Sequence, residues 1–355
     1  MLPWLATAQQ TEEATQPPVV APPGSRILWS GIFDGHYSFA NNHPSTNANQ
    51  LRNFDVKADR FALTMVRGAL EMAPEPFGFK VDIGYGKGYD VLNFNEPREA
   101  AQIIGQMYAS LKPKNWKGVQ VDFGKFMTSA GAEVFETHLN WNYSRSYLFA
   151  LGPYYHFGGR VTVPLQKHVT AGFQLVQGWN NIVDNNGART TGFTMSLTWD
   201  KIAWSHNYYV GPEGPSGASG MRHFYDTVLL LNPNRRVNAY INYDYGIDQN
   251  PIDGRKRFLG IATAVRIAVS DRLSLTPRYE WYNDVDGAAF ITGRKQKLRE
   301  VTVTGDWRFR NGLIARAEFR RDASNQPFFD RGNQAGAARG QTTMLVGFVA
   351  TIGPR

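Results

Sequence analysis

The stretch VQVDFGKFMTSAGAEVFETHLNWNYSRSYLF, residues 119–149, contains the change of pattern that decides the fold. It begins by alternating apolar Val121 and Phe123 with polar Asp122, as a strand does in a sheet with one apolar and one polar face. The alternation stops at Thr128–Ser144, where polar, acidic and aromatic residues follow one another without a period. A connection of about seventeen residues inside a β-domain is usually functional or disordered.

The composition excludes several classes of protein. The 355 residues suffice for two ordinary domains or one large barrel, and no run of 18 apolar residues could form a membrane-spanning helix. The hydrophobic content of 42% still permits a transmembrane barrel, in which every second strand residue faces water. The absence of cysteine excludes disulfides and thiolate metal sites. The net charge is +8, but Lys and Arg form no dense cluster, so we expect no nucleic-acid partner.

The first 26 residues differ from the rest. Ala6-Thr7-Ala8 resembles a signal-peptidase site, and Pro17-Pro18 and Pro22-Pro23 lie in a stretch rich in Gln, Thr and Glu. We therefore expect residues 1–26 to be a residual signal peptide followed by a disordered, Pro-rich lead-in. Residues 27–355 are expected to form one barrel.

From residue 27 onward, the chain reads as a succession of about sixteen strands. The predicted strands are Ile27–Ala40, Asn53–Met72, Phe77–Tyr85, Ala101–Leu111, Gly118–Met127, Arg145–Val163, Val169–Trp179, Arg189–Trp199, Ile202–Val210, Arg222–Leu231, Val237–Tyr245, Arg257–Val269, Leu273–Tyr282, Lys297–Arg310, Leu313–Arg321 and Gln341–Ile352. Asn53–Met72 keeps no single register, which predicts a β-bulge.

The connections alternate between long and short. The long ones are Asn41–Arg52, Gly86–Ala100, Thr128–Ser144, Asn180–Ala188, Gly211–Met221, Gly246–Lys256, Asn283–Gln296 and Asp322–Gly340. The short ones carry turn residues, such as Asn311-Gly312, which favours a two-residue hairpin. Short periplasmic turns and long extracellular loops are typical of a transmembrane barrel.

Charged residues recur on the polar faces of the predicted strands. They are Lys80, Asp82, Asp122, Arg266, Arg278, Glu280, Glu300, Asp306, Arg308, Arg316, Glu318 and Arg320. In a dry core or facing lipid each would cost several kcal/mol, whereas facing a water-filled lumen they cost little. The sequence therefore predicts an all-β fold, a transmembrane antiparallel barrel of about sixteen strands around an aqueous lumen. A propeller would bury both faces of its strands, and the sequence shows no blade signature.

Several motifs together resemble the OmpL-like β-barrel porin family of bacterial outer membranes. They are Asn49–Asp55, Val121–Glu136, Asn140–Ser146, Gly178–Asn181 with Asp184–Gly187, Arg278–Trp281 and Phe319–Phe329. The resemblance extends from about Leu28 to Ile352. It implies an outer-membrane barrel for solute diffusion and supplies no catalytic or ligand residues.

Thr128–Ser144 is the third long connection, which general porins fold into the lumen to set the pore size. We expect a constriction in which acidic and polar loop residues face arginines of the wall, so that a transverse field filters charge. The residues expected to form it are Glu133, Glu136, His138, Asn140, Arg278, Arg308, Arg316 and Arg320. The alternative is an external loop capped by its own aromatic residues.

Other motifs give weaker signals. Asp184-Asn185-Asn186-Gly187 offers oxygen ligands but is too short for a calcium loop, so a turn is expected. Gly84, Gly86 and Gly88 superficially resemble a phosphate loop, yet no helix is predicted to follow, and we expect a strand end. The histidines show no metal spacing. A Ser–His hydrolase built from Ser144 or Ser146 is conceivable but not favoured.

We therefore predict an outer-membrane porin that lets small hydrophilic solutes and ions diffuse passively, with no catalysis, cofactor or metal. The alternatives are a channel specific for a sugar or an anion such as phosphate, an outer-membrane enzyme, and a structural barrel with a plugged lumen. The arginines suggest a mild anion preference. Expected partners are outer-membrane lipid and the solutes, with a homo-trimer possible; the expected location is the outer membrane of a Gram-negative-type bacterium.

Overall fold

A computed structural model describes residues 26–97, 100–214, 220–250, 254–288, 292–309 and 312–353. The predicted lead-in of residues 1–26 therefore lies outside the described residues except for Arg26, and so does the first residue of the predicted Asn311-Gly312 turn.

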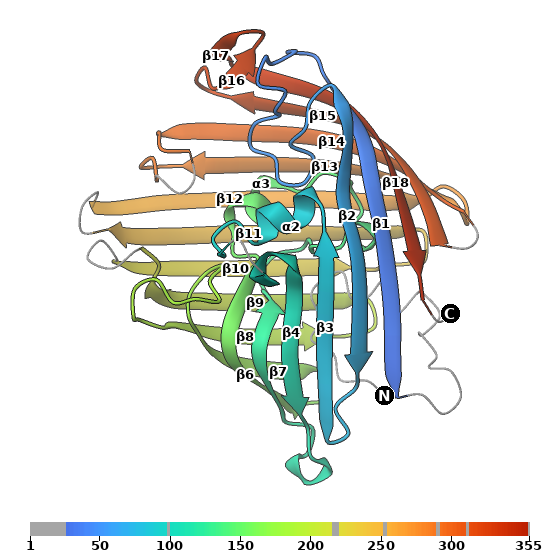
Figure 1. Ribbon diagram of the computed structural model, residues 1–355, viewed down its shortest axis with the longest axis vertical. Helices are drawn as coiled ribbons and strands as arrows, with labels where there is room; N and C mark the ends of the chain where they lie inside the picture. Colours follow the sequence, from blue (N-terminus) through green and yellow to red (C-terminus); the bar gives the residue numbers. More distant parts are fainter. Residues whose placement is uncertain are drawn as a thin grey trace.

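Sixteen strands of the described chain close into an antiparallel barrel (Figure 1). They are β1 (Ile27–Ala40), β2 (Arg60–Met72), β3 (Phe77–Tyr85), β4 (Ile104–Leu111), β5 (Gln120–Met127), β6 (Tyr155–Gln166), β7 (Val169–Val176), β8 (Thr190–Thr198), β9 (Ile202–Pro212), β10 (Met221–Leu231), β11 (Val237–Asn250), β12 (Gly254–Ala268), β13 (Leu273–Asp284), β14 (Gln296–Arg308), β15 (Leu313–Ser324) and β18 (Gly340–Ile352). Each pairs with the barrel strands before and after it along the chain, and β1 closes the ring by pairing with β18. The predicted fold class is thus confirmed.

A two-stranded hairpin, β16 (Phe329–Arg331) and β17 (Gln334–Ala338), lies in the last long connection and is not part of the barrel wall. The described helical segments are short: α2 (Lys87–Leu92), α3 (Tyr147–Leu151) and three single 3₁₀ turns at 100–103, 114–116 and 137–139. No helix among the described residues is long and apolar enough to cross a membrane.

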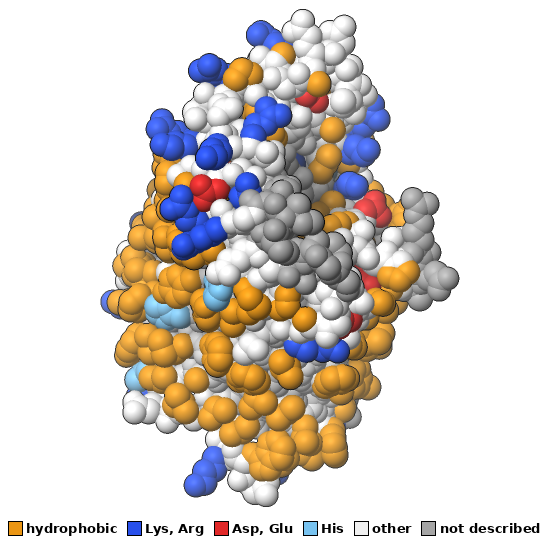
Figure 2. All heavy atoms as spheres, turned by 90° about the vertical axis from the view of Figure 1, so that its left-hand side faces the viewer, with side chains coloured by type: hydrophobic (Ala, Val, Ile, Leu, Met, Phe, Trp, Pro, Cys, Tyr) orange, Lys and Arg blue, Asp and Glu red, His pale blue; other side chains and the backbone are white. Residues whose placement is uncertain are grey.

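The wall has an apolar outside and a polar inside. On β14, Val301 and Trp307 are each 45% exposed, while Glu300, Thr302 and Thr304 on the opposite face are completely buried. The period of two in the sequence therefore places the charges inward, as predicted. Figure 2 shows the outer face, where hydrophobic side chains cover much of the surface.

Several strand boundaries differ from the prediction. β2 begins at Arg60, because residues 53–59 turn inward with the preceding loop. The bulge predicted in this strand is confirmed: the register with β1 shifts between Asp34 and Gly35, and Thr64 is the extra residue. The predicted long connection Gly246–Lys256 is mostly strand, since β11 runs to Asn250 and β12 starts at Gly254.

Two helices were not predicted. Residues 147–151 form α3 inside the predicted strand Arg145–Val163, so the third long connection extends to residue 154. Residues 87–92 form α2 directly after Gly86, where the sequence predicted a strand end without a helix. Figure 1 shows both helices within the barrel.

The interior contains packed side chains as well as polar ones. Phe135 of the third long connection contacts Phe54 of the first at 5.4 Å between ring centroids, and Tyr89 of α2 at 5.2 Å. These rings share one buried cluster with Ile32 and Met65 of the wall. At this height the wall therefore faces folded protein, and the prediction of water throughout the lumen is wrong here, because three loops fold inward and bury their aromatic residues together.

Candidate functional site

The connection between β5 and β6, residues 128–154, crosses the barrel interior. In the circular strand order β13 and β14 lie opposite β5 and β6, seven strand steps away by either route. The loop nevertheless makes hydrogen bonds to side chains of β13, β14 and β15. It therefore spans the lumen from one wall to the other, and we call it the crossing loop.

Arg316 of β15 holds the crossing loop by its backbone. Its guanidinium donates to the carbonyl oxygens of Thr137, Asn140 and Asn142 at 2.8, 2.5 and 3.2 Å. A guanidinium has five N–H donors in one plane, so a single arginine can satisfy several carbonyl groups that an irregular loop leaves unpaired. The Asp306 carboxylate, 2.9 Å away, compensates its charge.

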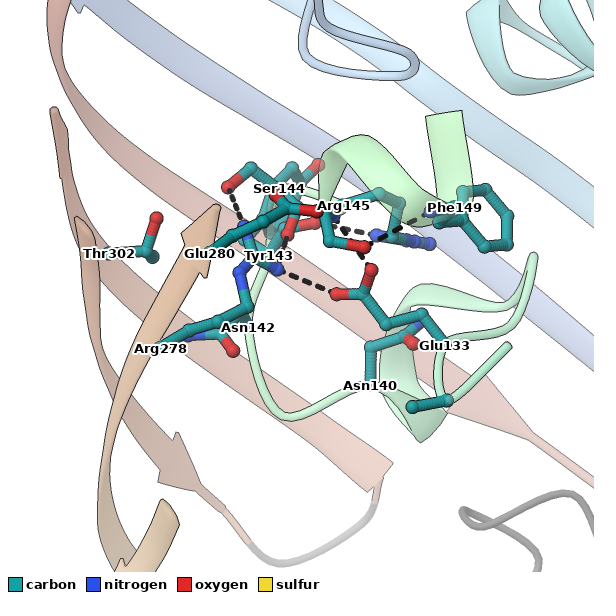
Figure 3. A network of polar contacts seen from close by, with 12 residues as sticks. Glu133, Asn140, Asn142, Tyr143, Ser144, Arg145, Phe149, Arg278, Glu280 and Thr302 are labelled. Atoms are coloured by element: carbon teal, nitrogen blue, oxygen red, sulfur yellow. Dashed lines mark hydrogen bonds and ion pairs between the residues drawn. The ribbon is translucent and has the colours of Figure 1, made fainter. Parts of the chain in front are cut away.

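Arg278 and Arg320 repeat this arrangement further along the crossing loop. Arg278 of β13 donates to the carbonyl oxygen of Ser144 at 2.7 Å and forms an ion pair with Glu133 at 2.6 Å (Figure 3). Arg320 of β15 donates to the carbonyl oxygen of Arg145 at 2.6 Å. The far wall thus binds the loop through both its backbone and a side chain.

Carboxylates of the same wall accept the loop's amides. Glu318 accepts the N–H groups of Tyr143 and Ser144 at 2.6 and 3.0 Å. Glu280 accepts those of Tyr147 and Leu148 at 2.6 and 2.8 Å, which are the first two residues of α3. Helix-start N–H groups have no partner within the helix, and a carboxylate there also interacts favourably with the helix dipole.

The crossing loop is also braced internally. The Arg145 guanidinium donates to the carbonyl oxygens of Val134, Phe135 and Tyr143 at 3.1, 2.7 and 2.5 Å. The Asn140 side chain accepts the N–H of Val134 at 3.0 Å and donates back to its carbonyl at 2.8 Å. These bonds give the segment one conformation without regular secondary structure.

A further contact joins the crossing loop to β1. Asp34 accepts hydrogen bonds from the hydroxyls of Thr137 and Tyr143 at 2.5 and 2.6 Å, and it is completely buried. Tyr143 also hydrogen-bonds to Thr64 and lies 5.2 Å from the His36 ring. The loop is therefore attached to the wall at β1 as well as at β13 and β15.

The structure brings together part of the predicted constriction. Glu133 pairs with Arg278, and Arg316 binds the carbonyl group of Asn140. Arg320 reaches the same loop two residues beyond Tyr143, at the carbonyl group of Arg145. Glu133 and Arg278 are in direct contact, and Arg316 and Arg320 bind carbonyl groups of the loop, so these residues do not face one another across an open gap.

The other predicted residues have different partners. Glu136 pairs with Arg67 of β2 at 3.3 Å. Arg308, near the end of β14, pairs with Asp306 at 3.2 Å. Burial lowers the pKa of His138 to about 3, so this imidazole is neutral at ordinary pH. It therefore adds no charge to the loop.

Sequence reasoning missed several residues that hold the loop. Arg145 was counted as the start of a strand, and Asp34 was not singled out although it alternates with apolar neighbours. The connection Asn41–Arg52 was taken as external and residues 53–59 as strand, yet Arg52 lies inside the barrel in ion pairs with Asp55 at 2.6 Å and Asp322 at 2.7 Å. No periodic signal marks a loop that folds inward, because its contacts come from distant strands.

Beside the crossing loop, the inward side chains of the wall are covered by protein. Arg278, Arg316 and Arg320 are each only 1% exposed. Towards the short-turn end of the barrel, inward polar side chains such as Ser196 and Ser205 are half-buried. The inner wall is therefore more exposed towards the short-turn end of the barrel than beside the crossing loop. A group of three His, Asp or Glu placed to hold a metal ion does not occur in the described part of the chain.

The family model described as "Putative beta-barrel porin-2, OmpL-like" matches residues 26–352. The chain belongs to this family. It is a porin, and both the resemblance noted in the sequence and the channel function are thereby shown. No curated protein matches this porin.

Solved structures with the same fold are porins and outer-membrane proteins of low sequence identity. An anion-selective porin from Comamonas acidovorans gives a TM-score of 0.63 at 13% identity, covering 92% of this chain and 99% of that one. OmpF of Salmonella typhi, in complex with daunomycin, gives 0.62 at 12%, covering 94% and 99%. The trimer form of OmpT from Vibrio cholerae gives 0.62 at 10%, covering 92% and 99%. At these identities the similarity shows the fold alone.

Proposed function

We propose that this porin is a narrow passage for small hydrophilic solutes and ions, and that the crossing loop sets its width. The observation that supports this is the attachment of residues 128–154 to the opposite wall through Arg278, Arg316, Glu280 and Glu318. A loop held on both sides of a lumen restricts what can pass beside it. Glu133, Glu136, His138 and Asn140 remain the proposed loop side of the constriction, with Arg278, Arg308, Arg316 and Arg320 on the wall.

The pairing of charges argues for weak ion selectivity. Arg278 is compensated by Glu133 and Glu300, at 2.6 and 3.0 Å, and Arg320 by Asp322 at 2.9 Å. Paired charges cancel much of their field at the distance of a passing ion. We therefore propose that the mild anion preference suggested by the sequence is small.

A planar-bilayer measurement tests the proposal. Wild-type porin should form channels of low single-channel conductance, and a salt gradient should give a reversal potential near zero. Glu133→Gln removes the loop's ion pair with Arg278, and we expect conductance to rise roughly twofold or to fluctuate more, because the loop loses a charged hydrogen bond. Asp286→Asn removes an exposed ion pair with Arg257 in the connection after β13, outside the crossing loop, and should leave conductance unchanged. Absence of any conductance in all three proteins would instead support a plugged structural barrel.

A sugar-specific track gains no support from the aromatic residues. Trp179, Phe224, Phe258 and Tyr282 form a row of rings along the inner wall, with centroids 5.1 to 6.5 Å apart. Each is at most 7% exposed. These rings pack against protein and are not presented to a solute.

We also propose that the porin catalyses no reaction. The Ser144 hydroxyl hydrogen-bonds to Arg320, and the Ser146 hydroxyl accepts the N–H of Phe149. Neither serine hydrogen-bonds to a histidine among the described residues, so the geometry of a Ser–His nucleophile is missing there.

The outer surface supports a homo-trimer in the outer membrane, which we propose as the assembly. Two hydrogen-bonded pairs point outward from β9 and β10. Trp204 of β9 bonds to Thr227 of β10 at 2.9 Å, and His206 of β9 bonds to Tyr225 of β10 at 2.9 Å. We call these four residues the polar patch. Their neighbours on β8 are the apolar Leu197 and Met195, and those on β11 are Tyr243 and Tyr245, so the polar patch borders the hydrophobic belt on the β8 side. Polar groups at membrane depth usually face protein, and a second copy would cover them.

A further inference from the structure

A cluster of cations lies on the outside of the barrel at the long-loop end. The alternation of the strands points Lys297 and Arg299 of β14 and Arg321 of β15 outward, while Arg331 and Arg339 extend from the β16–β17 hairpin. All five side chains are exposed. We call these five residues the basic rim. Figure 2 shows Lys and Arg side chains gathered above the hydrophobic surface in the upper half of that view.

The basic rim begins where the hydrophobic belt ends. Val301 pairs with Arg321 across the strands and is 45% exposed, and Phe319, two residues below Arg321, is 42% exposed. On β14 the next outward residue beyond Val301 is Arg299. The change from apolar to basic within one step along each strand places the cations at the expected boundary between hydrocarbon and headgroups on the outer side.

The positive charges of the basic rim are not paired with carboxylates of the described chain. Among the described residues, none of its five members forms an ion pair with a carboxylate. Exposed arginines elsewhere on the same side do: Arg257 pairs with Asp286 at 2.7 Å, and Arg189 pairs with Asp184. The local charge is therefore available to an external anion.

Three members of the basic rim surround one cavity. Arg321, Arg331 and Arg339 line a surface cavity of about 360 Å³, together with Asn41, Asn42 and Gly340. Three guanidinium groups around one space suit a phosphate group, because each can donate two parallel hydrogen bonds to its oxygens.

Arg321 is held in position at this cavity. Its guanidinium donates to the Thr342 hydroxyl at 2.7 Å. Gly340 leaves the space that the guanidinium occupies, since a Cβ there would stand 2.6 Å from Arg321 Nη2. Asn42 donates to the carbonyl groups of Asp330 and Gly340 and so fixes the base of the hairpin. The cavity is thus built from ordered contacts.

We propose that this cavity binds the phosphate of an anionic lipid headgroup in the outer leaflet. A lipid is favoured over free phosphate because the cavity adjoins the hydrophobic belt, where Met344 and Val346 of β18 are 57% and 50% exposed and could receive acyl chains. The proposal rests on the outer-membrane location of the barrel and is independent of conduction through it.

The test measures binding of diphosphoryl lipid A to the purified, detergent-solubilised porin by native mass spectrometry. The triple variant Arg321→Gln/Arg331→Gln/Arg339→Gln should bind at least about tenfold more weakly, because several charge-assisted hydrogen bonds are lost. The matched control is Arg235→Gln/Arg236→Gln/Arg272→Gln, which removes three exposed arginines from short turns at the opposite end. It should bind like wild type. Gly340→Ala displaces Arg321 without removing charge and should weaken binding by a smaller factor.

Each outcome decides the proposal. Equal binding by the rim variant and wild type would overturn it, and so would equal weakening in the control, which reports net charge alone. Competition by inorganic phosphate at the same molar concentration would assign the cavity to a free anion and overturn the lipid assignment. Folding is checked by the electrophoretic shift between unheated and heated samples. Conductance of the same preparations separates the two proposals, since loss of lipid binding with normal conductance leaves the passage intact.

Discussion

Glu318 shows how one side chain organises a loop far away in sequence. Its carboxylate accepts the N–H groups of Tyr143 and Ser144 and the Thr304 hydroxyl at 2.7 Å. In Glu318→Gln one of the two oxygens becomes an NH₂ donor, which leaves at least one buried N–H without an acceptor. We expect this change to cost about 1–3 kcal/mol of stability. Thermal unfolding in detergent and faster amide exchange at residues 143–144 are the measurements.

The control for this prediction is Glu71→Gln, an equal change of charge at a carboxylate that is 52% exposed. It should shift the unfolding temperature little, because an exposed ion pair contributes about 0–1 kcal/mol. Equal shifts in both variants would mean that the loop gains nothing specific from Glu318.

The side of the wall to which a single side chain points could be predicted from the sequence, whereas its hydrogen-bond partners could not. Alternation placed Arg278, Arg316 and Arg320 on the inner face, where they lie. Their partners Thr137, Ser144 and Arg145 come from a loop with no period. The separation between them is 134 to 179 residues. A period of two fixes the direction of a side chain but contains no information on which distant segment it meets.

At the scale of elements, strands were predictable and inward loops were not. The strands β13 and β14 alternate over their whole length, and the prediction missed them by at most a few residues. α3 spans only Tyr147–Leu151, which is shorter than two helical turns, so it gives no 3.6-residue signal. Its N-terminus is stabilised by Glu280 of a distant strand and by the Ser146 cap, and only the latter is local.

The connection between β7 and β8 should respond to pH through Glu213. This carboxyl group, just beyond β9, accepts the N–H of Trp179 at 2.8 Å and the Thr190 hydroxyl at 2.6 Å. Burial raises the pKa of Glu213 from 4.5 to about 7. The folded state therefore holds this proton more tightly than the unfolded state does. Its stabilising contribution is complete below pH 4.5 and is lost as the pH rises to about 7, by up to about 3 kcal/mol.

Amide hydrogen exchange at Trp179 between pH 4.5 and 8 checks this, after correction for the intrinsic exchange rate. Protection should fall as the pH rises in wild type. In Glu213→Gln, which cannot ionise, the corrected protection should not depend on pH. A pH dependence that persists in the glutamine variant would assign the effect to another group.

On the scale of the whole molecule, the barrel follows from the sum of patterns that are individually weak. Sixteen two-faced strands with neighbours paired in order leave β1 and β18 as the two unpaired edges, and pairing them removes both edges at once. The lumen that results is wide enough to admit loops. Its filling by the crossing loop, α2 and loop 41–59 could not be read from strand count, because the same wall could enclose water or protein.

The proposed trimer predicts which outer face is covered. Thr227 of the polar patch lies on β10, and β2 lies diametrically opposite in the ring. The chain has no cysteine, so Thr227→Cys and Val66→Cys each introduce a single thiol on the outer surface. With a short bis-maleimide in native membranes, Thr227→Cys should yield cross-linked porin and Val66→Cys should yield little, because only the first lies where copies would meet. Dominant cross-linking through Val66→Cys would place the interface on the other side. A monomeric mass for wild type in mild detergent, together with no cross-link from either thiol, would contradict the trimer. The polar patch would then face lipid, and the barrel would have to tolerate the free-energy cost of exposing polar groups to hydrocarbon.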